Sequence, residues 1–458
     1  MEIRTQKEFD AMDPKILRRT MGLCPVCRLE VKADVRRNGN AICLTKHCPE
    51  HGSVSDHLAQ GDDYRDLEDY YFSVMNSSGE KKPGGAELQV TFKCNMDCRI
   101  CYLGDFKDQL IDFEPTLQDI ENAVRESKYR VFTISGAEAT CREDLFEIIR
   151  ILKKHKKIVG LNTNGVKLAD PDYARQLKES GVDEVTVQFS GFDTEVEQRL
   201  RGRDYIPLKL KALENLEALG ISARINMLVA KGINEDQMVP VLRYVIQSGF
   251  IKMVNFGGIQ FVGRADGFPR EHYIMPDDMM KIIEDQTGGK IRKKHIYLLK
   301  KVELALSSFM NKTSCLYSFV SLVVRSGDEY EPIDHFLDLD GIEKYLDKYR
   351  DLYSRNPFWA RTYLLLMGLP IMMFHVKHLS ILQELFLTAT SYLFSKNYLS
   401  KSNRFVYLVF SVECDPYRMD QAVHDHCPHR FILFFDRVNG QFVRRSRPIE
   451  STKWLLWK

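Results

Sequence analysis

Three cysteines in one short run, Cys94, Cys98 and Cys101, are the residues of this chain whose type and spacing most clearly indicate chemistry. They follow a strand-like stretch at residues 87–92, so the end of one strand would present all three thiolates together. Iron-sulfur cubanes are normally held by four thiolates, and a compact set of three leaves one iron open for a ligand from outside the protein. We call these residues the cysteine triad and expect them to bind a 4Fe-4S cluster, with three ordinary buried thiols as the alternative.

A second group of thiols lies near the amino terminus. Cys24 and Cys27 form one closely spaced pair, and Cys43 and Cys48 follow after a gap. Four thiolates in two such knuckles fit a tetrahedral zinc ion or a single iron ion. The sequence therefore predicts a metal knuckle with four cysteine ligands, and it leaves open the choice between structural zinc and redox-active iron.

Six expected strands, alternating with helical patterns, must position the triad. The strands are expected at residues 87–92, 129–135, 158–163, 184–190, 223–230 and 253–261. The helical patterns lie near residues 116–128, 142–155, 172–180, 207–219 and 235–247. This alternation is typical of a parallel sheet built from βα units, so we predict an α/β fold with a partial (β/α)6 barrel similar to a TIM barrel. Active sites of such barrels lie at the carboxyl ends of the strands, where the triad is placed.

Small and polar residues follow the next three expected strands. The candidates are Gly136, Ala137 and Glu138 after the second strand, Thr163 and Asn164 at the end of the third, and Ser190 on the fourth. Small residues let the backbone approach a ligand closely, and Glu138 adds a carboxylate at the strand end. Gln188 and Ser190 share one face of their strand by the two-residue period, which suits hydrogen bonds to a ribose.

Together these motifs resemble the signature of the radical S-adenosylmethionine enzymes, and the resemblance covers most of the chain. It implies that the triad binds the 4Fe-4S cluster, whose open iron is chelated by S-adenosylmethionine, and that reduction yields a 5'-deoxyadenosyl radical. It also implies that residues 136–138 hold the amino group of the methionine moiety, although Ala137 departs from the usual second glycine. Thr163, Asn164 and Ser190 would lie near the cofactor, and an electron donor such as a ferredoxin or flavodoxin would be needed.

Residues 200–204 and 258–264 resemble one branch of that family, the archaeal tetraether lipid synthases and the related dihydropterin methyltransferase. The first hypothesis is therefore modification of an unactivated carbon in a lipid-like substrate, of the carbon-carbon bond-forming type. The second is methyl transfer to a pterin or another small heterocycle. A third, of a different class, is a non-catalytic metal-binding relative that acts through a partner. In this branch the knuckle resembles a rubredoxin-like iron domain, which would pass electrons.

Members of the branch carry further cysteines near the carboxyl terminus, which hold auxiliary 4Fe-4S clusters. This chain offers only Cys315, Cys414 and Cys427 there, too few for two clusters, so an auxiliary cluster stays an open question. A mixed site that combines Cys414 and Cys427 with the nearby histidines His424, His426 and His429 is an alternative. Cys141 and Cys315 are otherwise expected to be buried thiols.

The composition is that of an ordinary soluble protein: of 458 residues, 44% are hydrophobic and 28% are charged. A formal net charge of +2 gives no field that would favour nucleic acid as a partner. The first residues lack an apolar signal core, and the cysteines stand at metal-ligand spacings, so we expect a cytoplasmic protein without disulfides. The expected regions are a knuckle domain at 1–82, the barrel at 83–265 and a mostly helical substrate or auxiliary domain at 266–458.

Two stretches of the last region bear on membranes. The apolar run at residues 362–376 is shorter than the roughly 20 residues of a membrane span, and Pro370 interrupts it. With residues 379–394 it predicts a pair of core helices or, alternatively, a pair that contacts a membrane surface or lines an apolar channel. Basic residues at 290–301 indicate a solvated face or, alternatively, a site for a phosphate head group.

Overall fold

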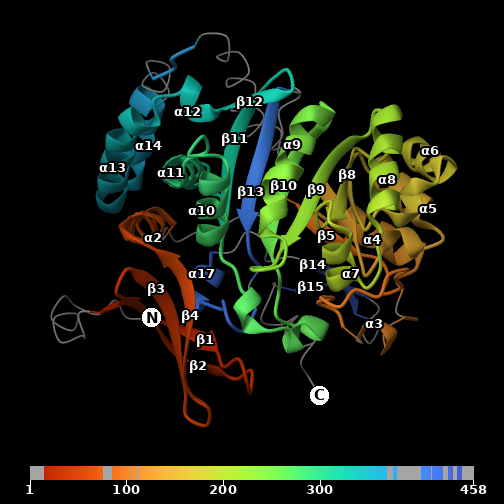
Figure 1. Ribbon diagram of the computed structural model, residues 1–458, viewed down its shortest axis with the longest axis horizontal. Helices are drawn as coiled ribbons and strands as arrows, with labels where there is room; N and C mark the ends of the chain where they lie inside the picture. The colour runs from red at the N-terminus through yellow and green to blue at the C-terminus, as the bar shows by residue number, and fades with distance from the viewer. Residues whose placement is uncertain are drawn as a thin grey trace.

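The computed structural model describes residues 15–75, 85–104, 106–109, 111–112, 114–368, 375–378, 404–413, 415–426, 432–436 and 441–445. Two sheets organise these residues (Figure 1). A small antiparallel sheet of four strands precedes a sheet of eleven strands, in the order β12-β11-β13-β10-β9-β8-β7-β6-β5-β14-β15. The large sheet carries the cysteine triad, and the small one carries the amino-terminal thiols.

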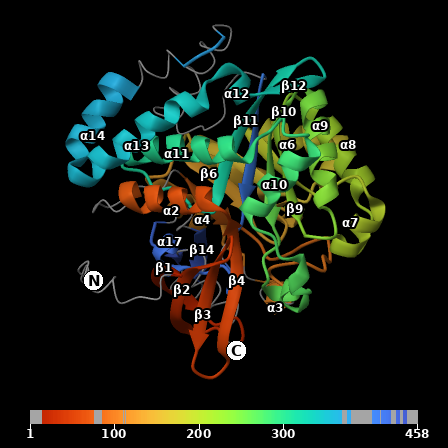
Figure 2. The same cartoon turned by 60° about the vertical axis from the view of Figure 1, so that its left-hand side comes forward.

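The small sheet is an antiparallel meander, which appears in red at the bottom of Figure 2. Its strands are β1 (Ile16–Leu23), β2 (Glu30–Asn38), β3 (Ala41–Cys48) and β4 (Gly52–Gln60), and helix α2 (Asp62–Met75) follows. The turns between β1 and β2 and between β3 and β4 lie at the same end of the sheet, because strand direction alternates. This arrangement brings the two halves of the knuckle together.

The six predicted parallel strands lie side by side in chain order, each paired in parallel with the next. They are β5 (Ala86–Gln89), β6 (Val131–Ser135), β7 (Ile158–Thr163), β8 (Glu184–Phe189), β9 (Ser222–Val229) and β10 (Ile251–Gly258). The helices that connect them are α3 (Phe106–Gln109), α4 (Leu117–Glu126), α5 (Leu145–Lys154), α6 (Pro171–Ser180), α7 (Thr194–Arg201), α8 (Ile206–Ala218) and α9 (Met238–Ser248). The predicted α/β fold class, with its βα units, is confirmed.

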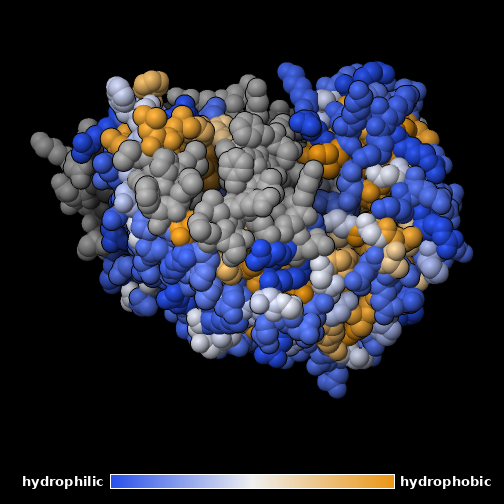
Figure 3. Space-filling model, turned by 90° about the horizontal axis from the view of Figure 1, so that it is seen from above, coloured by the Kyte–Doolittle hydropathy of each residue, from blue (hydrophilic) through white to orange (hydrophobic). Residues whose placement is uncertain are grey.

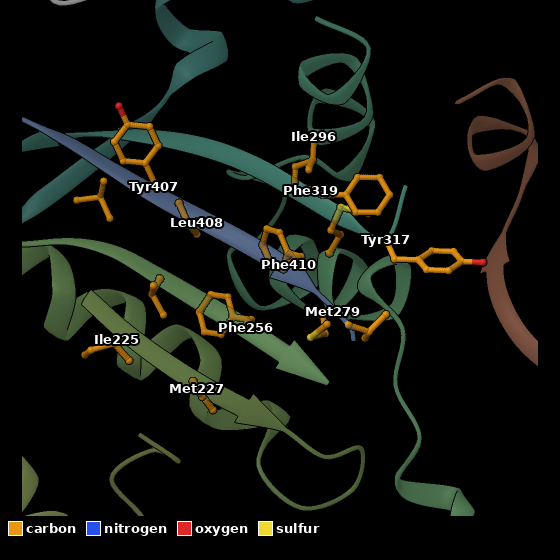
Figure 4. Close-up of a cluster of buried hydrophobic side chains, with 14 of the residues drawn as sticks. Ile225, Met227, Phe256, Met279, Ile296, Tyr317, Phe319, Tyr407, Leu408 and Phe410 are labelled. Atoms are coloured by element: carbon orange, nitrogen blue, oxygen red, sulfur yellow. The ribbon is translucent and has the colours of Figure 1, made fainter. Parts of the chain in front are cut away.

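The two faces of this sheet differ in chemistry. On β9 every second residue is fully buried and apolar, while the residues between them are only partly buried. Figure 4 shows the buried face, where Ile225, Met227 and Phe256 lie in one layer with Met279 and Ile296. The last two come from helices α10 (Pro276–Gln286) and α11 (Lys293–Phe309). The opposite face of the strands is the one that carries polar side chains.

The region after residue 265, expected to be mostly helical, also contributes strands to the large sheet. Its helices, besides α10 and α11, are α12 (Ile333–Phe336), α13 (Leu339–Arg355), α14 (Pro357–Tyr363) and α17 (Gln421–His424). Its strands are β11 (Ser318–Ser326), β12 (Glu329–Pro332), β13 (Phe405–Ser411), β14 (Ile432–Asp436) and β15 (Gln441–Arg445). Strand β13 pairs in parallel with β10, and β14 pairs in parallel with β5. The region therefore extends the sheet at both edges, while the boundaries 1–82, 83–265 and 266–458 stay predictions.

Short helical turns complete the described elements. They are η1 (Ala139–Cys141), η2 (Val166–Ala169), η3 (Glu235–Gln237), η4 (Gly263–Gly267), η5 (Arg270–His272) and η6 (Leu364–Gly368). Most of the predicted apolar pair, residues 369–374 and 379–394, lies outside the described residues. None of the helices in the described part of the chain is long and apolar enough to span a bilayer. Seen from above in Figure 3, hydrophobic residues form separate areas on a mostly hydrophilic surface.

The basic stretch at residues 290–301 is already paired with carboxylates of the protein. Arg292 pairs with Asp334 at 2.6 Å and Lys294 pairs with Asp340 at 2.7 Å. The other pairs are Lys290 with Glu331, Lys293 with Asp277, Lys300 with Glu303, and Lys301 with Asp66 and Glu343. This pairing argues against the phosphate site, because the cations are neutralised within the chain. Lys300 and Lys301 are buried, so only the first part of the stretch is a solvated face.

Candidate metal centres

The cysteine triad lies on the loop that follows β5, which we call the cluster loop (residues 93–104). All three thiols are half-buried. The backbone N–H of Met96 donates to Cys94 Sγ at 3.4 Å, and the N–H of Cys101 donates to the carbonyl of Cys98 at 3.3 Å. Among the described residues, the triad is not one of the groups whose ligand atoms all lie within 4.8 Å of one another. Such separation suits a cubane, in which each thiolate binds a different iron, better than a single ion.

The end of β10 holds the cluster loop from one side. The backbone N–H of Arg264 donates to the carbonyl of Cys101 at 3.0 Å, and its guanidinium pairs with Asp97. Gly263 has a φ of +63°, and a Cβ there would lie 2.7 Å from the Cys101 carbonyl oxygen and would also clash with that of Tyr102. Only glycine fits this close approach. The segment at residues 258–264 therefore positions the cluster loop.

The end of β6 holds the loop from the other side. A Cβ on Gly136 would lie 2.5 Å from the carbonyl oxygen of Thr91. The backbone N–H of Ala137 donates to that oxygen at 3.0 Å, and the N–H of Glu138 donates to the carbonyl of Lys93 at 2.9 Å. The small residues of the motif thus bring the strand end against the start of the cluster loop, with Glu138 directed to the end of β7.

Glu138 joins the predicted residues of two strand ends. Its carboxylate is 3% exposed and accepts hydrogen bonds from the Thr140 hydroxyl at 2.6 Å, the Thr163 hydroxyl at 2.7 Å and the Asn164 N–H at 2.6 Å. Burial, with the charge of Glu138 as a further cause, raises the pKa of Cys94 to about 12, which places the carboxylate close to the triad. Within the described residues no cation forms an ion pair with Glu138. A buried carboxylate in this state fits a positively charged ligand group such as an amino group.

Ser190 is the meeting point of a second buried network. Its hydroxyl is 1% exposed and accepts from Gln188 Nε2 and from Arg201 Nε, both at 3.2 Å. The sequence analysis did not single out Arg201, which is 5% exposed and whose Nη2 is buried without a hydrogen-bond partner in the described structure. An orphaned guanidinium N–H fits an anionic group such as a carboxylate. Its position within the 200–204 motif was the signal that could have found it.

Lys209 lies behind this network and was also not predicted. It is fully buried, with its Nζ 2.5 Å from Glu197 Oε1 and 2.7 Å from Gln188 Oε1. Burial lowers the pKa of Lys209 to about 8, although the carboxylate of Glu197 acts in the opposite direction. The ion pair of Lys209 with Glu197 fixes the amide of Gln188, which in turn donates a hydrogen bond to Ser190.

The amino-terminal knuckle brings together three of its four predicted thiols and one histidine. The ligand atoms of Cys24, Cys27, Cys48 and His51 all lie within 4.8 Å of one another. Cys27 Sγ is 3.8 Å from Cys48 Sγ, and His51 Nδ1 is 3.4 Å from Cys48 Sγ and 3.8 Å from Cys24 Sγ. Three thiols and one imidazole form a common tetrahedral zinc set.

Cys43, which the sequence analysis expected as the fourth ligand, is not part of this group. His51 is in its place. Cys43 and Cys48 are five positions apart on β3, so their side chains point to opposite faces of the strand. Cys43 lies opposite His57 of β4, and its thiol hydrogen-bonds to the imidazole. The spacing Cys48-x-x-His51 in the following turn was the signal that could have identified His51 as the fourth member of this group.

The other candidate ligands of the sequence analysis are separate from both centres. Cys414, Cys427 and His429 lie outside the described residues, and His424 and His426 belong to no group of metal-ligand atoms in the described structure. Cys315 is half-buried against the main core. Cys141 is half-buried as well, and its pKa is raised mainly by burial and further by the charge of Glu138. None of the described cysteines is in a disulfide.

Residues 415–420 fasten the knuckle to the large sheet. Lys46 of β3 is buried and donates to Asp56 at 2.6 Å and to the carbonyl of Tyr417 at 2.5 Å. Arg418 is also buried and donates to Asp415 at 3.0 Å and to the carbonyl of Ile259 at 2.9 Å. This block therefore connects the small sheet with the end of β10.

Comparison with known proteins gives matches for both centres. Residues 88–245 match the Radical SAM superfamily, and residues 16–60 match the HMPTM N-terminal zinc ribbon domain. A 7,8-dihydro-6-hydroxymethylpterin dimethyltransferase of Methanocaldococcus jannaschii is 26% identical over 366 residues, which cover 71% of each chain. A GTP 3',8-cyclase of Staphylococcus carnosus is 26% identical over 215 residues, 43% of this chain and 61% of the relative. A crystal structure of Streptococcus suis SuiB bound to precursor peptide SuiA is similar over 45% of each chain, with a TM-score of 0.40 and 17% identity.

Proposed function

We propose that this chain, a member of the radical SAM superfamily, is an enzyme. Its substrate would be a pterin or a related small heterocycle, which it would modify at a carbon centre. The observation that carries the proposal is the position of Glu138. A buried carboxylate without an ion pair in the described residues lies beside a cysteine triad on a loop fixed from two strand ends. The non-catalytic alternative gives no reason to keep that charge buried.

A radical SAM domain implies a 4Fe-4S cluster and S-adenosylmethionine as cofactors, and the residues present fit both. When bound and given one electron by a separate donor, the two together would supply a 5'-deoxyadenosyl radical, with methionine as the leaving group, for hydrogen-atom abstraction from the substrate. Cys94, Cys98 and Cys101 would hold three irons of the cluster. Glu138 would take the amino group of the cofactor, and Arg201 would take its carboxylate.

The substrate class follows from relatives and from the described surface. The names of the relatives given above refer to a pterin and to GTP, both of which contain fused nitrogen heterocycles. The lipid hypothesis rested on the apolar pair, most of which lies outside the described residues, and on basic residues that pair within the chain. We therefore place methyl transfer to a heterocycle first, and keep carbon-carbon bond formation on a lipid as an outcome of the test.

For the knuckle we propose a zinc ion held by Cys24, Cys27, Cys48 and His51. One imidazole among three thiolates favours zinc over the four thiolates of a rubredoxin-like iron, and residues 16–60 match a zinc ribbon. Electrons would then reach the cluster from a separate donor, such as a ferredoxin or a flavodoxin, rather than through the knuckle.

The test uses protein reconstituted anaerobically with iron and sulfide, a reductant and S-adenosylmethionine. Mass spectrometry would follow 5'-deoxyadenosine and the substrate with 7,8-dihydro-6-hydroxymethylpterin, with GTP, or with phospholipid vesicles. We expect 5'-deoxyadenosine, a pterin heavier by a methyl group, and S-adenosylhomocysteine from the second S-adenosylmethionine that donates that methyl group. Glu138→Gln should lower 5'-deoxyadenosine at least about tenfold, as expected for a lost charged hydrogen bond to the cofactor, while Glu143→Gln, at an exposed neighbour, should not. Absence of 5'-deoxyadenosine with every substrate would overturn the proposal, and a product from lipid alone would restore the first hypothesis.

A further inference from the structure

The polar face of the large sheet carries a row of amide side chains at one level. Gln188 of β8 is in register with Asn226 of β9, and Asn226 is in register with Asn255 of β10. On the next strand, β13, Ser411 lies beside this row. We call Asn226, Asn255 and Ser411 the carboxamide row. All three are partly buried. On each strand the preceding residue points to the opposite face and packs into the apolar core. Parallel strands covered by helices are usually apolar on both faces, so a polar row needs a reason.

The row is hydrogen-bonded in one direction. The Ser411 hydroxyl donates to Asn255 Oδ1 at 2.8 Å, and Asn255 Nδ2 donates to Asn226 Oδ1 at 2.8 Å. Gln188, on the other side of Asn226, already accepts from Lys209 and donates to Ser190. Within the described structure the amide N–H groups of Asn226 therefore end the chain without an acceptor. Polar groups that are partly withdrawn from water in this way favour a ligand that can accept their hydrogen bonds.

A further amide faces the same space from β7. The side chain of Asn162 is exposed although β7 lies within the sheet, between β6 and β8. Asn162 is in register with Thr186 of β8, which is in register with Arg224 of β9, so Asn162 lies on the same face as Asn226, two residues further from the strand ends. Asn162 and Asn226 thus present amide groups on the polar face, on the amino-terminal side of the cofactor site.

The surroundings of the row select the chemistry of the ligand. Arg224, two residues before Asn226 on β9, pairs with Glu184 of β8, so the two charges cancel. Leu228 and Met253 lie on the same face as Asn226 and Asn255 and add apolar contact. Small-molecule sites commonly combine apolar walls with a few fixed polar groups. An uncharged row of amides matches a flat, neutral ring that carries N–H and carbonyl groups on one edge, and it does not match a long hydrocarbon chain.

We infer that the carboxamide row, together with Asn162, binds the heterocycle that this enzyme modifies. The inference rests on the proposed function and adds to it the surface that recognises the substrate. The end of the row at Asn226 would donate to a ring carbonyl or ring nitrogen, and Asn162 would bind the ring from β7. A water-filled space lined by solvated amides is the competing account.

Equilibrium dialysis of 7,8-dihydro-6-hydroxymethylpterin against the reconstituted protein tests this inference. Asn226→Ala and Asn162→Ala should each weaken binding at least about tenfold, a change of about 1.4 kcal/mol, while iron and sulfide content and the affinity for S-adenosylmethionine stay at wild-type values. Ser222→Ala is the matched control, since it lies on the same face of β9 at its amino-terminal end, and it should bind the pterin normally.

The outcomes separate the two proposals. If the wild-type protein converts the pterin and both asparagine variants bind it with unchanged affinity, the inference is wrong and the proposed function stands. If the wild-type protein cleaves S-adenosylmethionine but neither binds nor converts the pterin or GTP, both are overturned. Asn255→Ala is a second probe of the row that leaves Asn226 in place, and it should also weaken binding because it removes the group that orients the Asn226 amide.

Discussion

The knuckle and the cluster loop are both built from cysteines, yet the chain prepares them in different ways. In the knuckle, three thiols and an imidazole from two turns of one small sheet already lie within 4.8 Å of one another. In the cluster loop the thiols stay apart, and the backbone around them is what is fixed, by Arg264 on one side and by residues 136–138 on the other. The first arrangement suits one ion, and the second suits a cluster that brings its own inner structure.

Cys48 of the knuckle and Cys94 of the cluster loop also differ in the pKa of their thiols. The pKa of Cys48 is lowered: burial raises it, but hydrogen bonds from His51 and Glu50 together lower it by more. The pKa of Cys94 is raised to about 12 by burial. Cys48 therefore loses its proton more readily than an ordinary cysteine, whereas Cys94 needs the positive charge of iron to do so.

One short segment contacts both centres. Arg28, next to the knuckle ligand Cys27, pairs with Asp266 in η4, and Arg264 in the same turn pairs with Asp97 in the cluster loop. The two centres differ in how they are built, but they share a support. The following predictions separate them, and the expected effects decrease from the first to the last.

Cys98→Ser should remove the cluster and leave the knuckle intact. Iron and sulfide should fall from about four each per chain to near background, and 5'-deoxyadenosine formation should stop. Zinc should stay near one per chain, because no knuckle ligand changes. Elemental analysis with sulfide determination would check this, and loss of zinc together with iron would show that the centres are not independent.

Cys48→Ser and Cys43→Ser should differ, although both thiols lie on β3. The first removes a knuckle ligand, so most of the bound zinc should be lost and the small sheet should unfold at lower temperature. The second removes a thiol that contacts His57, so zinc should be retained. Equal loss of zinc from both variants would restore the predicted set of four cysteines and remove His51 from the site.

Gly263→Ala should weaken the shared support on the side of the cluster loop. The added Cβ would meet the carbonyl oxygens of Cys101 and Tyr102, at a φ that alanine rarely adopts, which costs about 1–3 kcal/mol. Cluster iron should therefore decrease while zinc does not. Gly267→Ala is the control in the same turn, since its Cβ would meet open space, and similar loss in both variants would argue against a specific contact.

His57 should make the stability of the knuckle sheet depend on pH. Burial lowers its pKa, but the hydrogen bonds to Asp278 and Cys43 and the charges of Asp278 and Asp277 raise it to about 9, from an ordinary value of 6.5. Because the folded pKa is the higher one, the stabilisation is fully present below pH 6.5 and is lost as pH rises through about 9. In denaturant unfolding, the free energy of unfolding of wild type should fall by about 1–2 kcal/mol over this pH range, and that of His57→Gln should not. Identical pH profiles for variant and wild type would contradict the ion pair.

The sequence was sufficient for the parts that depend on local pattern. Six βα units follow from hydrophobic periodicity, and the gathering of Glu138, Thr163 and Asn164 follows from parallel strands ending at one edge. Cys43 was misplaced because counting cysteines ignores which face of a strand each side chain takes. Arg201 was missed because its importance comes from burial, which is a tertiary property.

The strands after residue 265 were missed for a related reason. β13 and β14 pair with β10 and β5, which lie far from them in the sequence, so no local period shows where they belong. The carboxamide row is similar, since its members come from three strands and only the register brings them together.

The most direct test of two separate metal centres is the metal and sulfide content of the wild-type protein after anaerobic reconstitution, together with Mössbauer spectra of the bound iron. We predict about four iron and four sulfide per chain in one cluster, and about one zinc with three thiolates and one histidine. Iron without sulfide would contradict the cluster, and a fifth iron in place of zinc would contradict the division of the two centres into one that performs the chemistry and one that supports it.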